Sequence, residues 1–151
     1  MPEFKEKEMH RVIEALKKDI AVTFDAADEK AVKNADAMLA SHGFPILPEE
    51  YANVLKITDG MVWNGIELYG TKSYERELKG YTIPSIVDVN MDFLGFDALE
   101  GKLIVGRMPE ELLVYSEEDK LWGCIDRMDF MVMQTAPSLK ELLATFVEGM
   151  L

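Results

Sequence analysis

The chain has 151 residues, of which 48% are hydrophobic, enough to bury the core of one domain and too many for a disordered chain. Its formal net charge of −12 at pH 7 would repel nucleic acid and anionic membranes, and it would attract a basic partner. The single cysteine, Cys124, excludes an internal disulfide, and no apolar run approaches the ~20 residues that span a bilayer.

The charged start of the chain, MPEFKEKEMHR, has neither the apolar centre nor the cleavage site of a signal peptide. Together with the lone cysteine, this predicts a soluble, cytoplasmic protein. Residues 1–20 carry equal numbers of acidic and basic side chains, so the acidic excess lies in residues 21–151. A partner of opposite charge is one explanation for that excess, and solubility alone is the other.

Residues 1–42 are expected to be helical. A stripe of apolar side chains at helical spacing predicts the first helix, and it consists of Met9, Val12, Ile13, Leu16 and Ile20. A second helix is expected after Asp25 and through the apolar positions from Ala31 to Leu39. Gly43 is expected to follow its end in the left-handed conformation.

A third helix is predicted over residues 47–60. Pro48 suits the first turn, where its missing N–H costs nothing. Glu49 and Glu50 lie where the helix dipole favours negative charge. The pair Asp59-Gly60 then supplies a stop, because glycine readily adopts a positive φ.

Residues 62–134 change to the period of strands. Asn64-Gly65 predicts a tight hairpin. Six short runs rich in β-branched and aromatic residues are expected to be strands: Ile66–Tyr69, Tyr81–Val87, Leu103–Arg107, Leu112–Ser116, Leu121–Asp126 and Phe130–Met133. The last four follow one another too closely for crossover helices, so they predict an antiparallel meander.

Residues 138–150 are predicted to form a closing helix, because Ser138 and Glu141 fit a capping box. Pro84 is expected to end a strand or to lie at a sheet edge. The order of elements indicates an α+β fold in which residues 1–151 form a single domain. Its mostly antiparallel sheet of about 5–6 strands would pack against N-terminal helices and a C-terminal helix.

No metal or cofactor site is predicted. His10 and His42 lie in different predicted helices and lack the spacing of zinc ligands. The segment after Asp88 starts like a calcium-binding loop, but Phe93 and Leu99 stand where that loop needs glycine and glutamate. The chain also contains no phosphate-binding loop and no GxSxG motif.

Catalysis by cysteine or by paired carboxylates is disfavoured. Cys124 lies in a strand pattern and is expected to be buried. Asp126 and Asp129, or the turn Glu117–Asp119, could be drawn as acid–base pairs, but a chain with 28 acidic residues brings carboxylates together by chance. Asp126 is expected to cap its turn or to pair with Arg127. The chain is therefore predicted not to be an enzyme, and a carboxylate-dependent enzyme is the least favoured alternative.

The aromatic side chains are mostly expected in the core or on the sheet, since their acidic surroundings disfavour base stacking. Trp63, beside the hairpin turn, is the one expected to be exposed and available to a partner. Met128, Met131 and Met133 are expected to fill gaps in packing.

The stretch LPEEYANVLKITDGMVWNGIELYG, residues 47–70, resembles the signature of the SUKH superfamily. The resemblance continues through Leu103–Gly106, Leu113–Tyr115 and Leu121–Arg127, and it is greatest to the YrhA-like branch. It implies an antiparallel sheet packed with helices and no catalytic constellation. In bacterial members the implied role is to bind and block a toxin, frequently a nuclease. In fungal members it is the regulation of cell-wall synthesis.

Two functions from different classes follow. In the first, the chain is an immunity protein, a non-catalytic binding module whose acidic surface covers a basic toxin domain. The residues predicted to contact that partner are Glu49, Glu50, Trp63, Glu67, Glu117, Glu118 and Asp119. In the second, the chain is a regulatory or scaffolding protein of cell-wall or signalling physiology with no toxin partner. Neither function needs nucleic acid, membrane or a cofactor, and a monomer or a weak homodimer through an edge strand is expected.

Overall fold

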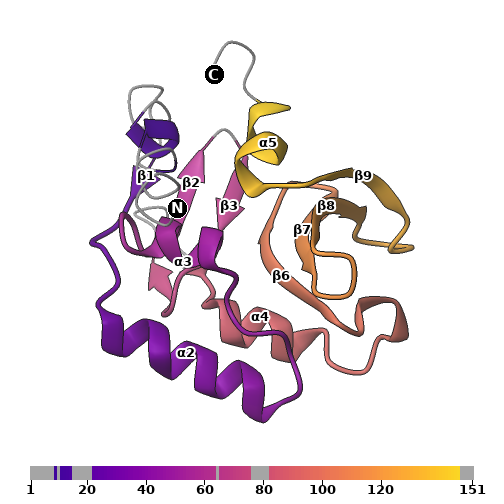
Figure 1. Ribbon diagram of the computed structural model, residues 1–151, viewed down its shortest axis with the longest axis horizontal. Helices are drawn as coiled ribbons and strands as arrows, with labels where there is room; N and C mark the ends of the chain where they lie inside the picture. Colours follow the sequence, from indigo (N-terminus) through magenta and orange to yellow (C-terminus); the bar gives the residue numbers. More distant parts are fainter. Residues whose placement is uncertain (1–8, 10, 15–21, 64, 76–81, 147–151) are drawn as a thin grey trace.

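The computed structural model describes residue 9 and residues 11–14, 22–63, 65–75 and 82–146. Seven strands of this part form one antiparallel sheet (Figure 1). In spatial order they are β1 (Val22–Thr23), β2 (Met61–Trp63), β3 (Ile66–Leu68), β6 (Lys102–Arg107), β7 (Glu111–Ser116), β8 (Leu121–Asp126) and β9 (Val132–Ala136). The predicted α+β fold with an antiparallel sheet is confirmed.

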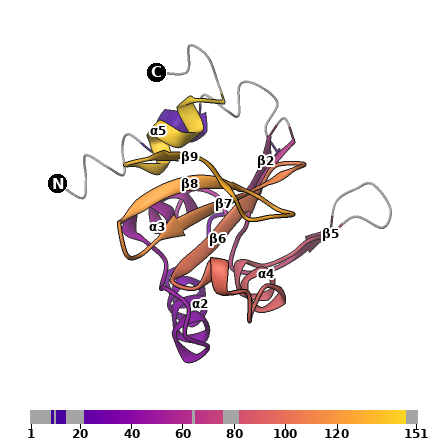
Figure 2. The same ribbon diagram turned by 90° about the vertical axis from the view of Figure 1, so that its right-hand side faces the viewer.

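Helices pack against this sheet (Figure 1). They are α2 (Glu29–Ser41), α3 (Glu49–Leu55), α4 (Ile86–Asp92), the 3-10 turn η1 (Asp97–Leu99) and α5 (Leu139–Ala144). Both views place α2 and α4 at one end of the molecule and α5 at the other (Figures 1 and 2). None of the described helices combines the length and hydropathy that a membrane span requires.

The N-terminal part contains helix and strand. Residues 11–14 are helical, and Met9, Val12 and Ile13 are buried in the core as the apolar stripe predicts. Leu16, Ile20 and His10 lie outside the described residues. A short strand that the helical prediction for residues 1–42 does not include lies between the two predicted helices, where Val22 and Thr23 pair with Val62 and Met61 to extend the sheet.

The ends of the second and third helices agree with the prediction only in part. Asp28 begins α2, and its Oδ1 accepts a 2.7 Å hydrogen bond from the N–H of Ala31. Gly43 follows the end of α2 with φ +81°, as expected. Pro48 is the N-cap residue of α3, one position before the first helical residue. The helix ends at Leu55, earlier than the predicted range of 47–60.

The strand meander agrees with the prediction in β6, β7 and β8, and β9 lies two to three residues later than expected. The run Tyr81–Val87 is not one strand. Among its described residues, 82–87, only β5 (Thr82–Ile83) is strand, and it pairs with β4 (Tyr74–Glu75) in a separate two-stranded ribbon. Pro84 ends β5 as expected, and α4 begins at Ile86 because the Oγ of Ser85 caps it by accepting the N–H of Asp88.

Two glycines of the SUKH-like stretch lie at a close crossing of the backbone. A Cβ on Gly60, which has φ +91°, would lie 2.8 Å from the carbonyl oxygen of Leu68. A Cβ on Gly70 would overlap the carbonyl of Asp59 and lie 2.7 Å from its Oδ1. The chain can therefore pass from α3 into β2, and from β3 towards β4, only where both side chains are absent.

The core connects the third helix to the sheet. Tyr51 in α3 is fully buried, and its hydroxyl hydrogen bonds with the carbonyls of Tyr69 and Val105, the second at 3.0 Å. Burial raises the pKa of this phenol well above its ordinary value. The hydroxyl thus bridges α3 to two neighbouring segments of the sheet while remaining protonated.

Candidate functional site

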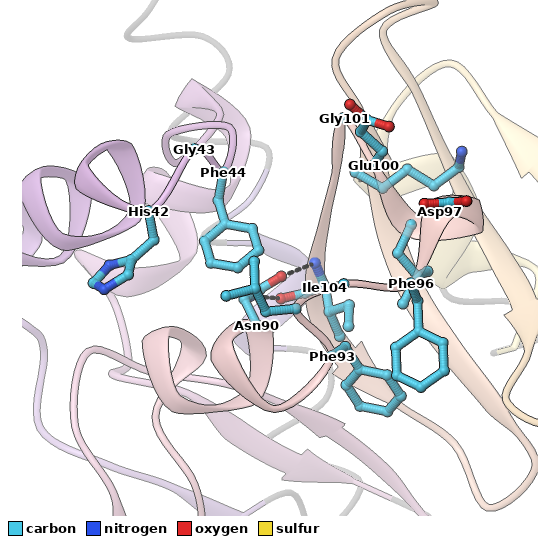
Figure 3. A pocket seen from close by; sticks show the side chains of 14 residues that line it. His42, Gly43, Phe44, Asn90, Phe93, Phe96, Asp97, Glu100, Gly101 and Ile104 are labelled. Atoms are coloured by element: carbon cyan, nitrogen blue, oxygen red, sulfur yellow. Dashed lines mark hydrogen bonds between the residues drawn. The ribbon is translucent and has the colours of Figure 1, made fainter.

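A cavity lies between the end of α2, the end of α4 and the start of β6. It has a volume of about 280 Å³, and Phe44, Phe93, Leu99 and Ile104 provide apolar lining (Figure 3). We call it the Phe pocket. Its members come from segments 42–44 and 90–104, which the sheet and two helices bring together. Residues 94–97 form its outer lip, where Leu94 and Phe96 are 54% and 49% exposed.

The amide of Asn90 holds one side of this pocket in place. Its Nδ2 donates to the carbonyl of Ile86 at 2.8 Å. The Nδ2 also donates to the carbonyl of Ile104, and the Oδ1 accepts the N–H of Ile104, both at 2.9 Å (Figure 3). Asn90 thereby gives this part of β6 the hydrogen bonds that a neighbouring strand would otherwise supply. The one buried polar side chain of the pocket is engaged in holding α4 against β6.

Acidic side chains surround one side of the pocket, and we call them the acidic rim. Asp97 and Glu100 lie on its lining and are exposed. The turn between β7 and β8 adds Glu117–Asp119, because the N–H of Glu117 donates a 3.0 Å hydrogen bond to the carbonyl of Gly101. Five acids stand here against two lysines, Lys102 and Lys120. The local charge is therefore negative.

Phe130 in the β8–β9 turn contacts the pocket lip, and exposed apolar side chains adjoin it along the chain; together we call them the Phe/Met surface. The ring of Phe130 lies 6.3 Å from that of Phe93 and 5.2 Å from that of Phe96, so the β8–β9 turn contacts the pocket lip. Exposed apolar side chains continue from this turn into β9: Met128, Met131, Val132 and Met133. The predicted gap-filling role of the methionines is wrong, since Met128 is 82% exposed and Met131 is 63% exposed.

The two carboxylates predicted at the start of α3 have different environments. Glu49 is exposed in the first turn. Glu50 instead reaches the start of α5, where its carboxylate accepts hydrogen bonds of 2.7 and 2.9 Å from the N–H groups of Leu139 and Lys140. The sequence could not reveal this contact, because the partners lie 89 and 90 positions away. Glu50 is therefore engaged inside the molecule.

The two residues predicted on the hairpin are buried. Trp63 is 5% exposed, so the expectation that it is free to meet a partner is wrong. Its neighbour across the turn, Ile66, is also buried, which places this end of the hairpin against the core. Glu67 is 7% exposed, and its Oε2 lies 3.8 Å from the Nε of Arg107. Of the predicted contact residues, only Glu49 and the Glu117–Asp119 turn are exposed.

A second buried carboxylate, Asp59, lies within a hydrogen-bonded cluster. It accepts from the N–H and the hydroxyl of Thr71, at 2.6 and 3.0 Å, and from the hydroxyl of Tyr74 at 2.6 Å. Burial, and then the adjacent Asp59, raise the pKa of the Tyr74 phenol above its ordinary value. The ring of Tyr74 also stacks on Phe24 at 4.2 Å. These contacts tie β4 to the end of α3 and account for the carboxylate.

Two side chains considered for catalysis in the sequence analysis, Cys124 and Asp126, are buried or hydrogen bonded within the molecule. Cys124 is buried as predicted, and burial raises the pKa of its thiol to about 11. Asp126 caps its turn as predicted, with Oδ1 accepting the N–H groups of Met128 and Asp129, and these bonds lower the pKa of its carboxyl. In the part of the chain that the structure describes, no three His, Cys, Asp or Glu side chains are grouped to hold a metal ion.

Comparison with known proteins leaves the family unassigned. No protein-family model matches the chain, and no curated protein sequence matches it significantly. The resemblance of residues 47–70 to the SUKH signature therefore stays a prediction. What the structure adds to it is a physical reason for Gly60 and Gly70, which lie at the backbone crossing described above.

Proposed function

We propose that this chain is a non-catalytic binding module that captures a basic protein, and that it acts as an immunity protein by covering the working surface of a toxin domain. One observation carries the proposal: acidic side chains lie on and beside the Phe pocket, and Phe130 of the Phe/Met surface contacts its lip. Charge would steer a basic partner to this face, and apolar contacts would then hold it. Effector domains that bind phosphate backbones are basic where they do so.

The state of the chain's reactive groups supports a role in binding. Asp59, Asp126 and Cys124 are held by internal hydrogen bonds or by burial. The exposed acids of the rim, in contrast, form no ion pair with any described residue, so they can meet charge from outside. The SUKH-like stretch points in the same direction, because bacterial members of that superfamily are expected to bind toxins.

The Phe/Met surface also favours a second candidate, a regulatory or scaffolding protein without a toxin partner. Such a protein would associate through apolar contact with little help from charge. Methionine side chains adapt to partners of different shape, which suits a scaffold. Salt separates the two candidates, since it slows the association of charged surfaces and hardly affects apolar ones.

The experiment starts with the tagged full chain in a lysate of its native host, at low and moderate salt, with captured proteins identified by mass spectrometry. A recovered basic protein is then purified, and its hydrolysis of DNA and RNA is measured with and without the chain. Stoichiometric inhibition is the expected result. A partner whose activity is unchanged, or recovery of envelope and signalling proteins alone, would contradict the immunity role.

A matched pair of variants tests the rim within the same assay. The first reverses three rim charges with Glu117→Lys, Glu118→Lys and Asp119→Lys. The second makes the same change in net charge elsewhere, on exposed acids of α2, β4 and α5: Glu29→Lys, Glu75→Lys and Glu141→Lys. Only the first should lose inhibition. Equal losses would show that net charge, and not this face, determines capture.

A further inference from the structure

The Phe pocket has the size and the chemistry of a site for one side chain. Its volume of about 280 Å³ falls just below the roughly 300 Å³ at which small-molecule sites begin. The rings of Phe44 and Phe93 face the cavity with Ile104 between them (Figure 3). Both hydrogens of the Asn90 amide are already donated to carbonyls, and its oxygen already accepts an N–H. An apolar group can enter without leaving that amide unpaired.

The negative charge at the opening of the Phe pocket indicates which residues should flank the inserted apolar side chain. Asp97 and Glu100 stand on the pocket, and the Glu117–Asp119 turn stands beside Gly101. These exposed carboxylates would attract lysine or arginine side chains on either side of an inserted residue. A second copy of this chain would bring a like charge of −12, so it suits this mouth poorly.

We propose that the Phe pocket receives one aromatic or branched apolar side chain from a basic segment of the partner protein. Lysine or arginine neighbours of that side chain meet the acidic rim, and the partner's next apolar contact falls on Phe96 and the Phe/Met surface. The inference rests on the proposed function, because it specifies the partner segment that the module would grip. Buried anchors of this kind carry most of the free energy of protein association.

The test needs no captured partner. The full chain, labelled with ¹⁵N, is titrated with the synthetic peptide Ac-Lys-Lys-Gly-Trp-Gly-Lys-Lys-NH₂ and followed by amide chemical shifts. Two matched peptides serve as controls: one has glycine in place of tryptophan, and one has glutamate in place of every lysine. The expected result is a set of shifts at the pocket residues Gly95, Gly101 and Ile104, with affinity weaker by about fivefold or more for either control.

A pair of variants of equal exposure completes the test. Phe96 at the pocket lip and Met38 on α2 are both 49% exposed. Phe96→Ser should lower the affinity for the basic tryptophan peptide by about fivefold or more, and Met38→Ser should leave that affinity unchanged. The proposal is overturned by an absence of shifts at the pocket, by equal shifts with all three peptides, or by equal effects of the two variants.

The outcome separates this inference from the proposed function. If the peptide does not bind at the Phe pocket but the chain still inhibits a captured basic partner, the proposed binding role is supported and the Phe pocket is not its anchor site. If the peptide binds as expected but no captured protein is inhibited, the proposed role of the Phe pocket is supported and the immunity role is wrong.

Discussion

The N–H of Glu117 donates a 3.0 Å hydrogen bond to the carbonyl of Gly101, and this bond places the acidic β7–β8 turn beside the Phe pocket. Gly101 lines that pocket and precedes β6, while Glu117 follows β7. The pairing of these two strands thus brings an exposed acidic segment next to an apolar cavity. Negative charge and apolar area on one face are the basis of the proposed binding role.

The close crossing at Gly70 predicts a large loss of stability on substitution. Gly70→Ala places a methyl group against the carbonyl and Oδ1 of Asp59, so one of the two backbones must move. We expect a loss of about 2 kcal/mol or more in the free energy of unfolding, measured by chemical denaturation. Gly43→Ala is the control: its Cβ has open space around it, and only the φ of +81° costs about 1 kcal/mol. Equal losses would contradict the steric account.

The capping of α5 by Glu50 predicts a local effect. Glu50→Ala removes the acceptor of the Leu139 and Lys140 N–H groups, which lie at the start of that helix. We expect the free energy of unfolding to fall by about 1 kcal/mol and hydrogen exchange of these two amides to accelerate. Glu49→Ala, one residue away and exposed, should change neither quantity. Unaltered exchange in Glu50→Ala would show that the helix end does not depend on this carboxylate.

The buried phenol of Tyr51 and the half-buried phenol of Tyr74 predict that the protein loses stability at alkaline pH. The pKa values of Tyr51 and Tyr74 are raised in the folded chain, so the folded state keeps protons that the unfolded state releases above its tyrosine pKa of about 10. The free energy of unfolding should therefore be constant below that pH, as far as these groups are concerned, and should fall above it.

Absorbance at 295 nm measures the ionisation of the tyrosines directly, because tyrosinate absorbs at this wavelength. Tyr51 and Tyr74 should titrate only as the chain unfolds, and Tyr74→Phe should lower by one the number of tyrosines that do so. The same variant should weaken the alkaline fall in stability. Titration of all tyrosines near pH 10 in the folded chain would contradict the raised pKa values of Tyr51 and Tyr74.

Much of the fold could be predicted because its signals are local. Apolar spacing identified the buried positions of the first helix, and the closely spaced runs after Leu103 identified the meander. Helix α4 was missed because Ile86-Val87 looks like the end of a strand. The Ser85 cap is a local signal that this interpretation overlooks. The bonds from Asn90 to β6, fourteen residues away, are not contained in any local pattern.

The candidate site was only partly predictable. The Glu117–Asp119 turn is exposed as a run of charges suggests, but its position beside the pocket follows from the pairing of β6 with β7. Trp63 looked like the exposed end of a hairpin and is buried because that hairpin lies within the sheet. The signal that was available for the pocket lip is the apolar run from Phe93 to Phe96, which lies between a helix and a strand where polar residues are usual.

The measurement that most directly tests the acidic rim is the association rate constant between the chain and its captured basic partner, followed from low to moderate salt. The account predicts a rate that falls steeply as salt rises, with both the rate and its salt dependence reduced when Glu117, Glu118 and Asp119 are changed to lysine. The control reversal at Glu29, Glu75 and Glu141 should retain most of both. A rate that ignores salt, or that responds equally to the two reversals, would contradict the claim that this face steers the partner.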